Sequence, residues 1–194
     1  MIEMTEKLQE ILQELKTSHA ETYYHSLRVK TLVAKMLKQM NRDNAAAYTP
    51  QEIAYICKGA LLHDVGKLHV KNVILTKDAS LTPEEKTSMS RHTEAGFFMI
   101  QGELCGGEFE MVKNICLYHH ERIDGNGYMG RKDLPVYVQA VAVCDVFDAL
   151  YTDRIYRKGL SYQDAMQVIK NGGCGLFDQC IIAYLEKAAG YFAK

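Results

Sequence analysis

The chain has 194 residues, of which 47% are hydrophobic, and this is enough to bury the core of one ordinary domain. Its formal net charge of -1 offers no overall positive field for duplex nucleic acid, although a local basic patch could still bind a small anionic ligand. The sequence contains no apolar run of about 20 residues. Its first residues alternate charged with apolar side chains, unlike a signal peptide. We therefore expect a single cytoplasmic domain over residues 1–194 that does not associate with membranes.

The six cysteines form no CxxC pair, and most lie within apolar stretches such as VAVCDVF. This pattern predicts reduced core residues rather than disulfides or zinc ligands. The cysteines concerned are Cys57, Cys105, Cys116, Cys144, Cys174 and Cys180.

Two amphipathic helices are predicted at the start of the chain, because apolar residues recur there every three or four positions. The first, within residues 1–19, precedes the core and carries Leu8, Ile11, Leu12 and Leu15 on one stripe. This stripe fits two interpretations, a surface for homodimer formation or a helix that faces the core. The second helix covers about residues 20–40.

Start signals mark most of the later helices. Thr49 and Thr82 are each followed by proline, which predicts a helix N-cap at both threonines. The first of these helices is expected to end at Gly66, and the second is expected to run into residue 95. Further helices are expected over residues 108–120, from Pro135, from Ser161 and after residue 178. With only three prolines and few alternating segments, the sequence predicts an all-α fold, a bundle of seven to nine helices.

Two histidine-containing pairs stand at predicted helix ends. His63-Asp64 ends an apolar helix, and adjacent side chains there diverge by about 100° and can serve neighbouring metal positions. His119-His120 adds two imidazoles, the commonest transition-metal ligands among side chains. Asp145 lies in an otherwise apolar run, where a carboxylate needs a partner such as a metal. Each feature alone also fits a structural role, but together they favour a dinuclear metal site.

Three further positions extend this set. Glu21 and His25 are spaced i,i+4, which can aim two ligands at one ion from one helix, although such a pair is by itself commonly structural. His92 alone fits a surface or capped histidine equally well. Asp148 follows Asp145 on the same helical face and can orient a ligand, contact substrate or form a cap or salt bridge.

Taken together, the motifs HDVGK, HHERIDGNGYM and DVFDALYTDRIYR, in this order and at these distances, resemble the HD-GYP subgroup of the HD-domain phosphohydrolases over residues 21–185. Members of that family are helical enzymes that hydrolyse cyclic dinucleotides, chiefly cyclic diguanylate, at two or three metal ions, usually iron or manganese. The resemblance implies that the metal ligands are Glu21, His25, His63, Asp64, His92, His119, His120 and Asp145, with Glu21 and His25 accompanying a third metal.

The resemblance also implies residues for substrate. Asp64 and Lys67 are the expected catalytic residues, the lysine contacting a phosphate and assisting the leaving oxygen, although a lysine after a helix end is commonly only solvated. The expected substrate contacts come from the GYP loop, from the helix of Asp145 and from two arginines suited to phosphates. They are Gly125, Gly127, Tyr128, Asp148, Arg154 and Arg157.

Several positions depart from the family pattern. Met129 replaces the proline of GYP, the stretch that follows is shorter, Gln139 stands where arginine is common, and His69 follows the HDxGK motif in place of Ile-Gly. Because these changes concern substrate recognition, three hypotheses remain. They are a phosphodiesterase for a cyclic dinucleotide, a phosphohydrolase for another nucleotide or phosphate ester, and a module that senses nucleotide without turnover.

Overall fold

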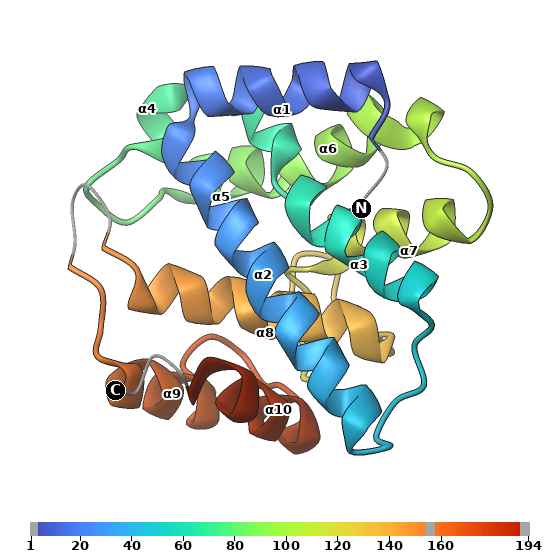
Figure 1. Cartoon of the computed structure of the whole chain (residues 1–194). Coiled ribbons are helices and arrows are strands. Elements are labelled where there is room, and N and C mark those ends of the chain that lie inside the picture. Colours follow the sequence, from blue (N-terminus) through green and yellow to red (C-terminus); the bar gives the residue numbers. More distant parts are fainter. Residues whose placement is uncertain (1–3, 154–157, 191–194) are drawn as a thin grey trace.

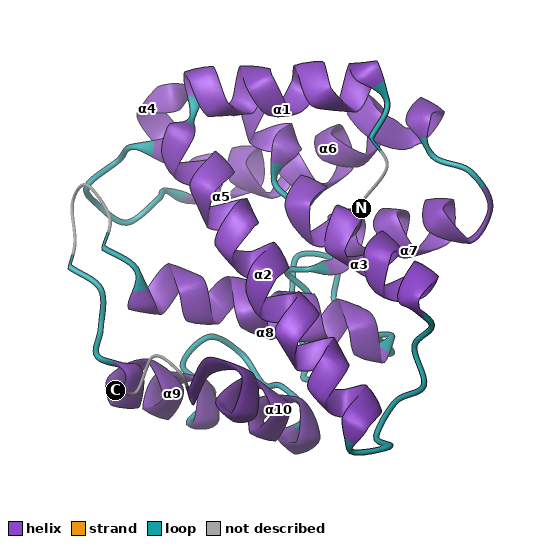
Figure 2. Cartoon of the chain, in the orientation of Figure 1, coloured by secondary structure: helices purple, strands orange, loops and turns teal. Residues whose placement is uncertain are grey.

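The computed structural model describes residues 4–153 and 158–190, so Arg154 and Arg157 lie outside the described residues. The all-α prediction is confirmed for the described part, which contains helices and loops but no β-strand (Figure 2). No described helix combines the length and apolar character that crossing a bilayer requires. The α-helices are α1 (Glu6–Ser18), α2 (Ala20–Arg42), α3 (Pro50–Leu62), α4 (Asn72–Leu75), α5 (Pro83–Ser90), α6 (His92–Ile100), α7 (Gly106–Tyr118), α8 (Val136–Tyr151), α9 (Tyr162–Lys170) and α10 (Gln179–Ala189).

The predicted helix starts are confirmed by their caps. Thr49 and Thr82 each accept a hydrogen bond from the backbone N–H three residues on, and Glu52 and Glu85 complete a capping box at the two sites. Ser161 likewise caps α9. The sequence therefore encodes these boundaries locally.

Three of the predicted helices differ from the structure in their boundaries. Helix α3 ends at Leu62 rather than Gly66, and a 3₁₀ turn, η1 (Val65–His69), follows it. The helix predicted from Thr82 is divided at Arg91 into α5 and α6, where the Ser90 hydroxyl donates to a carbonyl one turn back and competes with the helical pattern. Helix α7 covers Gly106–Tyr118, so the two histidines after it lie in a turn.

Helix α2 runs through the middle of the molecule and packs against α1, α3, α8 and α10 (Figure 1). One apolar cluster joins α2, α3, α8, α9 and α10, and a second lies among α1, α6, α7 and η1. Helices α3 and α7 contribute to both clusters. Four of the candidate site residues, His63, Asp64, His119 and His120, directly follow these two helices.

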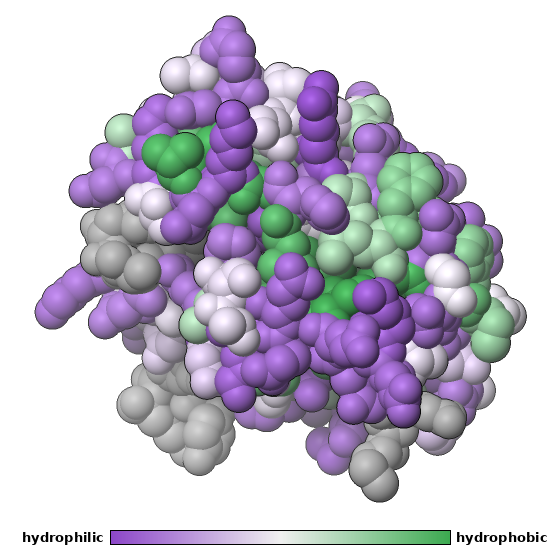
Figure 3. All heavy atoms as spheres, turned by 90° about the horizontal axis from the view of Figure 1, so that it is seen from above, coloured by the Kyte–Doolittle hydropathy of each residue, from purple (hydrophilic) through white to green (hydrophobic). Residues whose placement is uncertain are grey.

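The apolar stripe of α1 faces the second cluster. Leu8, Ile11 and Leu15 are buried, so of the two interpretations of this stripe the structure supports the core-facing one. Seen from above, this side of the molecule is largely hydrophilic, with a band of hydrophobic atoms across it (Figure 3).

All six cysteines are free, as predicted, but only three of them are buried, and Cys174 is partly exposed. Cys57, Cys116 and Cys144 are buried, whereas Cys105 and Cys180 are exposed. The exposed pair lies at the starts of α7 and α10, where the chain leaves a loop, and apolar neighbours in the sequence do not reveal this.

Candidate metal centre

Two adjoining groups of histidine and aspartate side chains lie at the ends of α3 and α7, where α2, α6 and α8 meet them. Within each group, one ligand atom from every residue lies within 4.8 Å of the others. The first group is Asp64, His92, His119 and His120, and the second is His25, His63 and Asp145. The structure thus brings together all the predicted metal ligands except Glu21.

Backbone carbonyls orient three of the imidazoles. The Nδ1 atoms of His63 and His92 lie 2.8 and 2.7 Å from the carbonyl oxygens of Ala60 and Met89, and Nδ1 of His119 lies 3.0 Å from a carbonyl of its own helix. A carbonyl oxygen only accepts, so each Nδ1 carries the proton and donates it. This leaves the Nε2 lone pair of each ring directed into the centre, the arrangement typical of metal-binding histidine.

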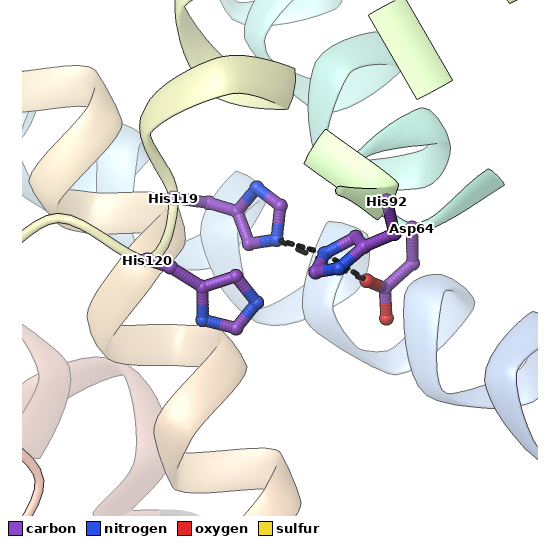
Figure 4. Close-up of side chains that lie close together, drawn as sticks. All are labelled: Asp64, His92, His119 and His120. Atoms are coloured by element: carbon purple, nitrogen blue, oxygen red, sulfur yellow. Dashed lines mark hydrogen bonds and ion pairs between the residues drawn. The ribbon is translucent and has the colours of Figure 1, made fainter. Parts of the chain in front are cut away.

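The atoms that face the centre fit a cation. Nε2 of His92 lies 3.2 Å from Nε2 of His119, so two lone pairs point at each other (Figure 4). Nε2 of His63 and Oδ1 of Asp64 are buried and have no hydrogen-bond partner within the described part of the chain. Buried polar atoms left in this way are costly unless another group satisfies them. Imidazole nitrogens with carboxylate oxygens form a donor set for iron, manganese or zinc.

Asp64 lies between the two groups. Its Oδ1 is 3.3 Å from Nε2 of His92 (Figure 4). Its Oδ2 is 3.3 Å from Nε2 of His63. Lys67 donates to the same Oδ2 at 2.6 Å. One carboxylate thus faces both groups and carries a lysine beside it. Burial alone would raise the pKa of Asp64, but Lys67 and the histidines hold it well below its ordinary value, so the carboxylate is ionised.

Burial keeps the histidines of the first group neutral. It lowers the pKa of His92 to about 4 and that of His120 to about 3, and it lowers the pKa of His119 well below its ordinary value. Neighbouring imidazoles in the group add to this effect. Neutral imidazole is the form that binds metals.

His25 is held differently from the others, between two carboxylates of α8. Its Nε2 lies 2.9 Å from Oδ1 of Asp145, and its Nδ1 lies 2.6 Å from Oδ2 of Asp148. Burial alone would lower the pKa of His25, but these two hydrogen bonds raise it to about 9. Arg28 binds both oxygens of Asp148 at 2.7 and 2.9 Å. Both oxygens of Asp148 therefore contact protein groups, which favours an orienting role for this residue over a substrate contact.

The loop after His120 carries the predicted GYP-like residues. The Tyr128 ring lies over that of His120, with centroids 4.5 Å apart, and meets the His92 ring edge-on. Gly125 has φ of +82°, a conformation that favours glycine. A side chain at Gly127 would overlap Glu121. Tyr128 thus covers one side of the first group.

Glu21 belongs to neither group. It is exposed and lines a cavity of about 740 Å³ beside the centre, which Lys67 also lines. The other walls are the α1–α2 junction, residues 72–81 and Met89. The volume lies within the range of small-molecule sites.

Sequence reasoning missed Arg28 and Glu121. Arg28 follows His25 by three residues on the same helix, and this spacing is the signal that places it beside the same partners. Glu121 follows the two histidines and is 1% exposed. No local pattern indicates that it turns inward.

The sequence pattern of the HD domain family matches residues 22–150. A cyclic di-GMP phosphodiesterase of Pseudomonas aeruginosa is 33% identical over 184 residues, which cover 93% of this chain and 42% of that protein. The 3'3'-cGAMP-specific phosphodiesterase 1 of Vibrio cholerae is 31% identical over 163 residues, 81% of this chain and 35% of that protein. The chain thus spans less than half the length of these relatives.

Among solved structures, an HDG"Y"P protein of Bdellovibrio bacteriovorus, Bd1817, shares the fold. Its TM-score is 0.67 at 23% identity, and the match covers 87% of this chain and 52% of that one. The family pattern covers most of the chain, including every residue of the two ligand groups. The chain therefore belongs to the HD domain family, and its HHERIDGNGYM motif relates it to the HD-GYP type.

Proposed function

We propose that this chain is a metal-dependent phosphodiesterase that hydrolyses a cyclic dinucleotide, with cyclic diguanylate as the first candidate, to a linear dinucleotide or mononucleotide. The observation that carries the proposal is the position of Asp64, whose two oxygens face the two ligand groups while Lys67 stands beside them. The names of the similar proteins from Pseudomonas aeruginosa and Vibrio cholerae support the substrate class. We further propose that residues 1–194 act as a single phosphohydrolase domain.

The proposed ligands of two ions are the two groups, and the carboxylate of Asp64, a member of the first group, faces both of them. Mixed imidazole and carboxylate donors favour iron or manganese over magnesium. Bound divalent ions supply Lewis acidity toward phosphoryl oxygens and a nucleophile at neutral pH. Glu21, at the edge of the cavity, is the candidate for a third ion together with His25.

The chain's own groups then position the phosphodiester. The Lys67 side chain is 20% exposed; it donates to Asp64 and also lines the cavity. We assign to it the contact with a phosphate oxygen and the proton for the leaving oxygen. Gly125, Gly127 and Tyr128 are the proposed contacts of the loop, where Tyr128 offers a ring for a base and a hydroxyl for a phosphate. Arg154 and Arg157 remain proposed phosphate contacts from the sequence alone.

The cavity beside Lys67 is the proposed site for the nucleotide. Its lining mixes polar and apolar side chains, and this lining and the cavity's volume suit a ligand that combines hydrogen-bonding groups with apolar surface. Several residues with polar side chains line this cavity. They include Ser18, His19, Glu21, Lys67 and Asn72. Of these residues, Ser18, His19 and Asn72 have no proposed role in metal binding or proton transfer, so they would select the base rather than perform the chemistry.

A second candidate is the hydrolysis of a different nucleotide, favoured by Met129 and the shortened loop and by the cGAMP-specific relative. The third candidate is a nucleotide sensor without turnover. The complete ligand set and Lys67 argue against a sensor.

The test is a reconstitution of the protein with iron(II) or manganese(II) under anaerobic conditions, followed by incubation with cyclic diguanylate and chromatography of the products. We expect linear product from the wild type and none from Asp64→Ala. Turnover of only another nucleotide in a parallel panel would support the second candidate. Binding without turnover at full metal occupancy would support the sensor.

A further inference from the structure

The loop that follows the two adjacent histidines, residues 121–131, is fastened to the rest of the fold at two places. Its first half is bound to the α9–α10 connection, where the Ile123 N–H donates to the Leu176 carbonyl at 3.2 Å and the Leu176 N–H donates to Asp124 at 3.1 Å. The Arg122 guanidinium adds a bond to the Cys174 carbonyl at 2.8 Å. This half of the loop is therefore held by the backbone of a distant segment.

The second half is held by one buried carboxylate. Oε1 of Glu121 accepts from the Met129 N–H at 2.8 Å, and Oε2 accepts from the Arg131 N–H at 2.6 Å. Glu121 is 1% exposed, and a buried carboxylate is costly unless it accepts hydrogen bonds. These two amides supply the bonds, so the position of Glu121 and the path of residues 129–131 depend on each other.

The residue between these anchors is Tyr128. It precedes Met129 directly, and its ring lies against His120 and His92 of the first ligand group. Gly127, on its other side, passes so close to Glu121 that an added Cβ would lie 2.6 Å from Oε1. The carboxylate thus contacts the loop on both sides of the tyrosine.

Met129 supplies one of the two donors to Glu121. The HD-GYP pattern has proline at this position, and proline has no backbone N–H. The bond from residue 129 to Glu121 is therefore one that the family's consensus residue cannot form. The replacement of proline by methionine removes ring rigidity and supplies a donor instead.

We propose that Glu121 is a positioning residue that holds Tyr128 over His120 and His92 through the amides of Met129 and Arg131. It thereby sets the shape of the substrate side of the first ligand group. The proposal rests on the proposed function only for its effect on substrate; the effect on the loop itself is independent of any substrate.

The experiment compares Met129→Pro, which removes the donor, with Met129→Ala, which retains it, and with the isosteric Glu121→Gln. Met129 is 46% exposed, so its replacement leaves the core intact. The first readout is hydrogen exchange of the Arg131 amide, measured without substrate. We expect exchange about tenfold faster in Met129→Pro and Glu121→Gln, because a hydrogen bond to a charged group is lost or weakened. Met129→Ala should match the wild type.

The second readout is the split between KM and kcat in the manganese-loaded enzyme. A loosened loop should raise KM several-fold in Met129→Pro and Glu121→Gln while leaving manganese affinity unchanged. Unaltered Arg131 exchange in both variants would overturn the proposal. Equal KM in all variants despite faster exchange would overturn the effect on substrate. If no nucleotide is turned over, the exchange data still test whether Glu121 holds the loop. Failure of the proposed function and failure of this proposal are therefore distinguishable.

Discussion

The Asp148 carboxylate lies 2.6 Å from Nδ1 of His25 and so determines which nitrogen of that ring faces the metal centre. Arg28 holds the same carboxylate from the other side through two hydrogen bonds. The planar guanidinium matches both carboxylate oxygens, which makes the chain from Arg28 to His25 geometrically defined. Arg28 and Asp148 thus orient His25, a member of the second ligand group, although neither belongs to that group.

Removal of Asp148 should weaken metal binding at the second group. Loss of a partner that orients a ligating histidine typically costs about 10- to 100-fold in metal affinity. We therefore expect Asp148→Ala to lower manganese affinity by this factor, measured by anaerobic calorimetric titration. Arg42→Ala, which removes an exposed side chain at the end of α2, the helix that carries His25, is the control. Equal manganese affinities in both variants would show that Asp148 does not orient His25 for metal binding.

Gly66→Ala should disrupt the approach of η1 to α6. A Cβ at Gly66 would lie 2.0 Å from the His92 carbonyl oxygen and 2.4 Å from the Gly96 nitrogen, both backbone atoms. Such overpacking costs typically about 1–3 kcal/mol. In Gly59→Ala the nearest atom is the tip of Ile115, which can rotate, so this variant is the control. Urea unfolding should show the larger loss for Gly66→Ala; the reverse order would contradict the prediction.

Lys58 and Glu108 form a buried ion pair between α3 and α7. Removal of one partner leaves an unpaired buried charge, which costs about 3–5 kcal/mol, whereas replacement of both by apolar residues is often neutral. We expect Lys58→Met and Glu108→Met each to lower the free energy of unfolding strongly and the double variant to recover most of the loss. A double-mutant cycle by denaturant unfolding checks this. Additive losses would show that the pair is not coupled.

Manganese should stabilise the native protein, because a ligand that binds only the folded state adds about 2.7 kcal/mol at a concentration of 100 Kd. We expect a clear rise in Tm on addition of manganese and its reversal by chelator. Asp64→Ala should remove most of this rise. His69→Ala should retain it, since His69 is exposed and outside both ligand groups. A rise in Tm of equal size in Asp64→Ala would place the metal elsewhere.

Much of the fold could be predicted from local sequence. The caps at Thr49, Thr82 and Ser161 use hydrogen bonds that span three residues, so the chain carries the signal within a short window. The sequence misplaced the ends of α3 and α7. The histidines and the aspartate that follow these helices turn into the metal centre, and tertiary packing decides this turn. The residue types and spacing also indicated which histidines and aspartates gather.

Tertiary structure alone decided how those residues are used. Asp148 and Arg28 are 120 positions apart in the chain, and only the packing of α2 on α8 brings them together at His25. The inward turn of Glu121 depends on amides that a sequence pattern does not locate. The sequence by itself determined the helices, the family and the set of candidate ligands, since these follow from local propensity and residue chemistry. The orientation of each ligand and the hydrogen bonds that hold the loop of residues 121–131 follow from contacts that only the folded chain contains.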